Sequence, residues 1–216
     1  MWEKQLAAAI KAGELAKRAI LEIYKSPFKV ELKKDKSPVT TADKKADKII
    51  TEYLKEAYPE YAVLSEESQD DKKRLNNDFV WVVDPLDGTT NFVDKNDEFT
   101  INIALIHKHK VVVGVIIIPT TGEIYYATNH GGAFYSINGK VKEIHVSRNV
   151  DMIRVLLSRS HHGKKEEEVL DFSLSKNLIS EALITSHPEQ YSKDHDIISF
   201  LETTFGAERT PLVTKI

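Results

Sequence analysis

The sequence predicts an α+β fold in which two helices come first and an antiparallel sheet follows. Two amphipathic segments open the chain, and a series of short apolar runs separated by polar or Pro/Gly turns comes after them. Helices and strands are therefore grouped along the chain, which favours a layered α+β sheet over repeated βαβ units. We expect an N-terminal α+β domain over residues 1–145 and a partial C-terminal α/β domain over residues 146–216.

The first predicted helix covers residues 3–24. Apolar residues recur on one of its faces at helical spacing, with Lys and Glu between them: Leu6, Ile10, Ala16, Ile20 and Ile23. Gly13 lies on the same face, where the missing side chain would let a neighbouring element approach closely. We therefore expect tight packing along this face.

The second predicted helix begins near Thr40 or Thr41 and runs to about residue 57. Thr40 and Asp43 have the three-residue spacing of a capping box, and Pro38 just upstream disfavours helix. The side chains expected to face inward are Ile49, Ile50 and Leu54.

The remaining predicted elements are strands. The apolar runs that indicate them occupy residues 61–65, 79–83, 99–107, 111–118, 123–127 and 131–135. Short turns between the later runs are typical of an antiparallel meander, and Asn138-Gly139 marks a hairpin. Two further strand candidates, residues 154–160 and 182–185, lie in the polar C-terminal part.

Composition excludes several classes of protein. Hydrophobic residues make up 41% and charged residues 29% of the 216 residues, as in an ordinary soluble domain. A net charge of −3 gives no electrostatic case for nucleic-acid or membrane-surface binding. With no cysteine, any metal must be held by oxygen or imidazole. Since neither a membrane span nor a signal-peptide pattern is present, we expect a cytoplasmic protein.

The most informative segment is residues 81–92, Trp-Val-Val-Asp-Pro-Leu-Asp-Gly-Thr-Thr-Asn-Phe. We expect the buried strand to stop at Asp84, where Pro and Gly turn the chain. The carboxylates of Asp84 and Asp87 and the carbonyl of Leu86 are oxygen ligands of the kind Mg²⁺ prefers. Thr89 adds a hydroxyl that would orient a water. Taken alone, a solvated Asp-rich turn explains this segment as well as a metal loop does.

Other acidic residues are predicted to lie near this loop. Glu66 and Glu67 end one strand, and Asp43 lies in the first turn of the second helix. A solvated strand end and a helix cap explain them individually. Crowded together, however, the carboxylates would raise one another's pKa unless divalent cations lay between them. Two metals about 4 Å apart are a known arrangement for phosphoryl transfer.

Three segments together resemble the signatures of a phosphatase superfamily. They are Ser-Pro-Val-Thr-Thr-Ala-Asp at 37–43, Glu-Glu-Ser at 66–68 and Asp-Pro-Leu-Asp-Gly-Thr at 84–89. The superfamily is lithium-sensitive and Mg²⁺-dependent, and contains inositol monophosphatases, fructose bisphosphatases and 3'(2'),5'-bisphosphate nucleotidases. The resemblance covers residues 1 to about 161 and implies a layered αβαβα sandwich that acts on a small phosphorylated substrate.

The resemblance implies two or three Mg²⁺ ions held at the strand ends. Glu66, Asp84 and the Leu86 carbonyl would hold the first ion. Asp84 would also bridge to a second ion, which Asp87 binds as well.

It also implies the catalytic and phosphate-binding roles. Thr89 and Asp43 would orient and deprotonate the attacking water, with Glu67 as an acidic neighbour. The amides of Gly88 and Thr89 would meet the substrate phosphate, as amides at a helix N-terminus do. The reaction would be an in-line attack without a covalent enzyme intermediate.

The choice between subfamilies rests on smaller details. Residues 97–106 and Ser158-Arg159-Ser160-His161 resemble the nucleotidases, which implies that Ser160 and His161 contact the substrate. Thr90-Asn91-Phe92 instead matches the inositol phosphatases. We favour a nucleotidase that converts adenosine 3',5'-bisphosphate to AMP and phosphate. An inositol-1-monophosphatase or another sugar phosphatase is the alternative.

The C-terminal part departs from the family pattern. The sequence contains neither the Gly-Ser-Ser segment nor the Trp-Asp-x-Ala-Ala-Gly segment that the family carries there. We interpret this as a chain cut short, with incomplete C-terminal layers and a second Mg²⁺ site that lacks one ligand. A non-catalytic metal-binding remnant is therefore an alternative to the enzyme. The family also suggests a homodimer.

Overall fold

The computed structural model of the chain describes residues 1–33, 38–146, 154–158 and 181–185. One compact unit comprises Met1–Ile144, and a second lies within His145–His195.

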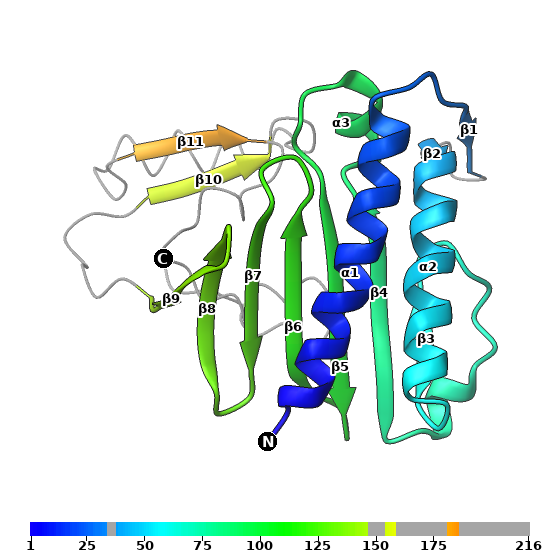
Figure 1. Ribbon diagram of the computed structural model, residues 1–216, viewed down its shortest axis with the longest axis vertical. Helices are drawn as coiled ribbons and strands as arrows, with labels where there is room; N and C mark the ends of the chain where they lie inside the picture. Colours follow the sequence, from blue (N-terminus) through cyan, green and yellow to red (C-terminus); the bar gives the residue numbers. More distant parts are fainter. Residues whose placement is uncertain (34–37, 147–153, 159–180, 186–216) are drawn as a thin grey trace, which may run out of the picture. The chain divides into compact units, whose positions relative to one another are not determined.

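The first unit is built on a seven-stranded sheet with the strand order β3-β4-β5-β6-β7-β8-β9 (Figure 1). The strands are β3 (Ala62–Ser65), β4 (Phe79–Asp87), β5 (Thr100–His107), β6 (Lys110–Ile118), β7 (Glu123–Thr128), β8 (Gly132–Ile137) and β9 (Lys140–Ile144). β3 pairs with β4 in parallel, and all later neighbours are antiparallel. The predicted meander is therefore confirmed from β4 onwards.

Two long helices, α1 (Glu3–Tyr24) and α2 (Thr41–Ala57), cover one face of this sheet (Figure 1). Alternate residues of β6 show how the strands divide between the two faces. Val115 and Ile117 join the helices in the main core, whereas Ile116 and Ile118 belong to a smaller apolar cluster with Tyr125. The α+β class and the two predicted helices are thus confirmed.

Gly13 allows α1 to approach the sheet closely. A Cβ atom at this position would lie 2.5 Å from Cδ1 of Ile117 on β6, which is too short for a carbon–carbon contact. A larger residue would therefore require the Ile117 side chain, at least, to move. The close packing predicted at Gly13 is therefore confirmed.

The expectation that the strand preceding the Asp-Pro-Leu-Asp-Gly segment ends at Asp84 is wrong. β4 continues to Asp87, and its ladder with β5 contains an irregularity between Asp84 and Asp87. Pro85 lies inside that irregularity, where its missing N–H removes no regular ladder bond. Proline therefore bulges the strand here instead of ending it.

Short elements complete the first unit. β1 (Val30–Leu32) and β2 (Pro38–Thr40) form a separate antiparallel pair, η1 (Lys73–Asn76) is a 3₁₀ turn, and α3 (Thr89–Asp94) follows β4. Asn138 and Gly139 have φ values of 50° and 76°, so both occupy the left-handed region that a two-residue hairpin uses. The predicted hairpin is therefore confirmed.

The described part of the second unit is a parallel pair of strands, β10 (Arg154–Ser158) and β11 (Glu181–Thr185). Both were predicted as strands from the sequence, with slightly different bounds. No helix in the described part of the chain is long and apolar enough to cross a membrane.

Candidate active site

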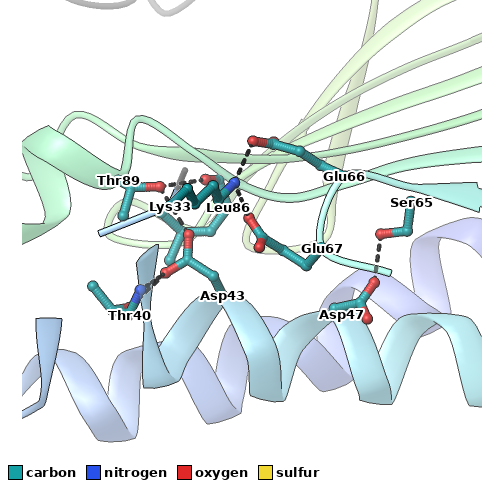
Figure 2. A network of polar contacts seen from close by, with 9 residues as sticks. All are labelled: Lys33, Thr40, Asp43, Asp47, Ser65, Glu66, Glu67, Leu86 and Thr89. Atoms are coloured by element: carbon teal, nitrogen blue, oxygen red, sulfur yellow. Dashed lines mark hydrogen bonds and ion pairs between the residues drawn. The ribbon is translucent and has the colours of Figure 1, made fainter. Parts of the chain in front are cut away.

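The strand ends of β3 and β4 and the first turn of α2 bring acidic side chains together at one edge of the sheet. Because β3 and β4 are parallel, their C-terminal ends meet at this edge. The amide of Glu66 donates to the carbonyl of Val83 over 3.1 Å, which places Glu66 beside the residue that precedes Asp84. Figure 2 shows Glu66, Glu67, Asp43 and Thr89 around the same point.

A bulge places both aspartates of β4 on one side of the strand. Asp84 pairs with Asn102 and Asp87 with Thr100, so three steps along β4 correspond to two steps along β5. In a regular strand, residues three apart point to opposite faces. One extra residue reverses that relation, and the carboxylates of Asp84 and Asp87 are close enough to repel each other.

Asp84 is held in surroundings that disfavour its own negative charge. Its Oδ1 is shielded from solvent and has no hydrogen-bond partner among the described residues. Desolvation, followed by the charges of Asp87 and Glu66, raises the pKa of Asp84 to about 9. A cation at Oδ1 would favour the ionised carboxylate.

Asp87 is oriented by a buried amide on the neighbouring strand. Asn102 of β5 is 1% exposed, and its Nδ2 donates to Asp87 Oδ2 over 3.2 Å. Oδ1 of Asn102 has no partner in the described part of the chain. The amide therefore keeps the Asp87 carboxylate on the same side of the sheet as Asp84.

The two glutamates after β3 share one lysine. Lys33 Nζ donates to Glu66 Oε1 over 2.7 Å and to Glu67 Oε1 over 2.5 Å (Figure 2). Desolvation opposes the charge of Lys33, but the bonds to both glutamates outweigh it and raise the pKa of this amine. Burial raises the pKa of Glu67 although Lys33 acts in the opposite direction.

Asp43 joins the start of α2 to the loop after β4. Its Oδ2 accepts hydrogen bonds from the amide of Thr40 over 2.8 Å and from the Thr40 hydroxyl over 2.5 Å. Its Oδ1 accepts from the hydroxyl of Thr89 over 2.8 Å, and that hydroxyl also lies 3.3 Å from the Leu86 carbonyl. Asp43 is thus both the helix cap expected from the sequence and a partner of Thr89.

The donor set of this edge fits a hard divalent cation. Two carboxylates on one face of β4, one of them with a buried oxygen that lacks a partner, lie beside the Leu86 carbonyl and near Glu66. Within the described ranges, no three carboxylate or imidazole groups are spaced as they stand to share one ion. The positive charge beside Glu66 and Glu67 is instead the Lys33 amine.

Comparison with known proteins identifies the family. Residues 1–198 match the family model described as the inositol monophosphatase family. The chain belongs to the inositol monophosphatase family. This confirms the resemblance drawn from the three sequence motifs, and the family is one of metal-dependent phosphomonoesterases that act on small phosphorylated substrates.

Different relatives are named for different activities. The chain is 39% identical to the 3'(2'),5'-bisphosphate nucleotidase CysQ of Salmonella typhimurium over 173 residues, which cover 79% of this chain and 68% of that protein. It is 40% identical to the inositol-1-monophosphatase of Rhizobium meliloti over 127 residues, 59% of this chain and 47% of the relative. The chain thus spans about half to two thirds of the length of these curated relatives.

A solved structure agrees with the fold. The crystal structure of CysQ from Bacteroides thetaiotaomicron, a bacterial member of the inositol monophosphatase family, superposes with a TM-score of 0.72 at 33% identity. The match covers 86% of this chain and 73% of that chain. The layered α+β fold implied by the sequence resemblance is therefore confirmed.

Most of the predicted site residues lie together in this family member. The structure brings seven of them to one edge of the sheet: Asp43, Glu66, Glu67, Asp84, Leu86, Asp87 and Thr89. Gly88 lies between β4 and α3 with φ 91°, a left-handed conformation that favours glycine. Ser160 and His161 lie outside the described residues, so their contacts with substrate remain a prediction.

Three polar residues of this region were not predicted from the sequence: Lys33 after β1, Asp47 of α2 and Asn102 of β5. Asn102 interrupts an apolar strand, which is a signal for a buried polar role. Asp47 follows Asp43 by four residues and so shares its helix face.

Proposed function

We propose that this chain is a Mg²⁺-dependent phosphomonoesterase of the inositol monophosphatase family, with 3'(2'),5'-bisphosphate nucleotidase activity. The proposed reaction converts adenosine 3',5'-bisphosphate and water to AMP and phosphate. In this proposal Glu66, Asp84 and the Leu86 carbonyl hold one ion, and Asp84 and Asp87 hold another.

The observation that carries this proposal is the state of Asp84. A buried carboxylate oxygen without a partner, next to two other carboxylates, disfavours the ionised form, so the group either keeps its proton or binds a cation. Oxygen ligands alone favour Mg²⁺ over the softer transition metals. Bound Mg²⁺ would neutralise the substrate phosphate and increase the acidity of the attacking water.

The chain's own residues would supply orientation and a proton acceptor. The Thr89 hydroxyl donates to Asp43, so its oxygen lone pairs remain to accept a hydrogen bond from a water. A proton leaving that water would pass through Thr89 Oγ to Asp43 Oδ1. Because Thr40 fixes the other oxygen of Asp43, the acceptor is held in place before substrate binds.

Two observations support the nucleotidase over the inositol phosphatase. The alignment with the Salmonella nucleotidase covers 79% of the chain, against 59% for the Rhizobium inositol-1-monophosphatase. In addition, Asn91, which matched the inositol version, is 6% exposed, and its Oδ1 accepts from Asn96 over 2.8 Å. Since this side chain is buried within α3, its identity says little about the substrate.

The proposal is tested by phosphate release from the purified chain. Adenosine 3',5'-bisphosphate and inositol 1-phosphate should be compared at equal concentration, with Mg²⁺, with EDTA and with Mg²⁺ plus Li⁺. We expect Mg²⁺-dependent release that is faster from the nucleotide and is inhibited by Li⁺. The same preparation would show by sedimentation whether the chain forms the homodimer that the family suggests.

Two results would contradict this assignment. Faster release from inositol 1-phosphate would favour the inositol-1-monophosphatase alternative. A chain that binds Mg²⁺ yet releases no phosphate from either substrate would instead be the non-catalytic metal-binding protein considered from the sequence.

A further inference from the structure

Asp47 of α2 lies outside the residues assigned to catalysis, yet both oxygens of its carboxylate are bound to the segment that carries the glutamates. Oδ1 accepts a hydrogen bond from the hydroxyl of Ser65 (Figure 2), and Oδ2 accepts one from the hydroxyl of Ser68 over 2.5 Å. Asp47 is 8% exposed and Ser65 is 5% exposed. Because this carboxylate is shielded from water, it stabilises the fold only while both serine hydroxyls remain hydrogen-bonded to it.

The two serines flank the pair Glu66-Glu67 on either side. Residues 65–68 form the glutamate turn. Asp47, a single residue of α2, therefore accepts hydrogen bonds from both ends of this turn. Because Asp43 and Asp47 are four residues apart, they lie on the same face of α2. One helix face thus contacts the loop after β4 through Asp43 and the glutamate turn through Asp47.

Among the described residues, few other contacts fix the glutamate turn relative to the loop after β4. The amide of Glu66 is bonded to the carbonyl of Val83, but the Glu66 side chain is 51% exposed. Lys33 contacts both glutamates through a flexible side chain and fixes no backbone. The two serine bonds to Asp47 are therefore the contacts best placed to fix the turn relative to α2.

We propose that Asp47 is a positioning residue that fixes the Glu66-Glu67 turn against α2 and thereby sets the affinity of the site for Mg²⁺. This inference rests on the proposed metal-dependent function. It concerns a residue that touches neither metal nor substrate and acts through Ser65 and Ser68.

The test is Mg²⁺ binding by calorimetry on the full chain and on three variants. Asp47→Ala should weaken Mg²⁺ binding by about tenfold or more, the usual range for residues that orient metal ligands. Ser65→Ala combined with Ser68→Ala should weaken binding to the same degree. Glu56→Ala, an exposed acidic position on the same helix, should leave the affinity unchanged.

Coupling between the changes separates positioning from general destabilisation. Because Asp47 acts through the serines, adding Asp47→Ala to the double serine variant should cause no further loss of affinity. Thermal unfolding and hydrogen exchange of the Glu66 amide, measured without metal, should show a folded protein in which only the glutamate turn exchanges faster.

Several results would overturn the inference. They are an unchanged Mg²⁺ affinity in Asp47→Ala, losses that add between Asp47→Ala and the serine changes, and a parent chain that binds no Mg²⁺. A parent chain that binds Mg²⁺ with the expected variant pattern but releases no phosphate contradicts the proposed function alone.

Discussion

The acids at the end of β4 and the acids that follow β3 belong to one candidate site but are held in different ways. Asp84 and Asp87 lie inside a strand, where the ladder with β5 and a single bulge set their direction. Glu66 and Glu67 lie beyond the end of a strand, where Lys33 contacts both carboxylates and the flanking Ser65 and Ser68 donate to Asp47 of α2. The first pair is positioned by the strand ladder, whereas the second depends mainly on side-chain contacts.

The two pairs also differ in how their negative charge is balanced. Asp84 has a solvent-shielded oxygen without a partner in the described part of the chain, so a bound cation would stabilise its ionised form. Glu66 and Glu67 already have a cation in Lys33, which metal binding has to displace or accommodate. In the proposed metal site, β4 would therefore supply the rigid half and the glutamate turn the adjustable half.

The largest effect is expected from Asp84→Asn. The amide cannot replace a bridging carboxylate, so Mg²⁺-dependent phosphate release should fall below detection. The variant should nevertheless fold, because it no longer carries a group whose charge the site disfavours. Calorimetry with Mg²⁺ and thermal unfolding without metal would check both statements.

Asp94→Asn is a matched control for this change, since Asp94 is exposed on the short helix that follows. It should retain activity and Mg²⁺ affinity. If Asp84→Asn kept Mg²⁺-dependent activity, Asp84 would not be a metal ligand and β4 would lose its assigned role.

Thr89→Ala should reduce kcat by about 10²–10⁴, the usual range for losing a group that assists proton transfer. Its effect on Mg²⁺ affinity should be small, because Thr89 contacts Asp43 and the Leu86 carbonyl and is not an assigned ligand. Thr89→Ser keeps the hydroxyl and should restore most of the rate. An equal loss in both variants would show that the methyl group, and not the proton, is what matters.

Mg²⁺ binding should release protons and strengthen as pH rises. In the metal-free folded chain the pKa of Asp84 is raised to about 9, so at neutral pH Mg²⁺ has to displace a proton from it. The unfolded chain has lost that proton above about pH 4, so the stability of the metal-free fold should fall as pH rises toward 9.

Calorimetry in two buffers with different ionisation enthalpies measures this proton release. We expect release in the parent chain and its absence in Asp84→Asn. A binding enthalpy that is independent of the buffer in the parent would show that Asp84 is already ionised without metal.

The smallest effect is expected from Lys33→Met, which removes the cation beside the glutamates. Partly exposed ion pairs contribute about 0.2–1 kcal/mol, so Mg²⁺ affinity should rise by about 1.4- to fivefold as competition is lost. Lys44→Met, which breaks the exposed pair with Glu31, is the control and should not change Mg²⁺ affinity. Weaker binding in Lys33→Met would mean that Lys33 supports the metal-bound arrangement.

The sequence predicted the order of elements well, and the acidic residues that its motifs single out lie at one edge of the sheet. The two helices and the meander follow from apolar periodicity, and Asp43, Asp84 and Thr89 belong to local motifs with fixed spacing. It failed at the end of β4, because a proline inside a bulge and a proline that ends a strand give the same local pattern.

The adjustable half could be predicted only in part. The contact of Lys33 with Glu66 joins residues that are 33 positions apart, and that of Asp47 with Ser68 joins residues 21 apart. No local spacing encodes such contacts, because they depend on how β1, α2 and β3 are arranged in space. Asn102 was closer to being predictable, since an amide within an apolar strand requires a partner.

The central claim is that β4 holds the metal through Asp84, and its most direct test is a crystal structure of the chain soaked in Mn²⁺. Mn²⁺ takes oxygen ligands as Mg²⁺ does and is visible by anomalous scattering. We predict an anomalous peak bound by the Asp84 carboxylate and the Leu86 carbonyl, with Lys33 withdrawn from Glu66. A fully loaded crystal with no peak at Asp84, or with its peaks elsewhere, would contradict the account.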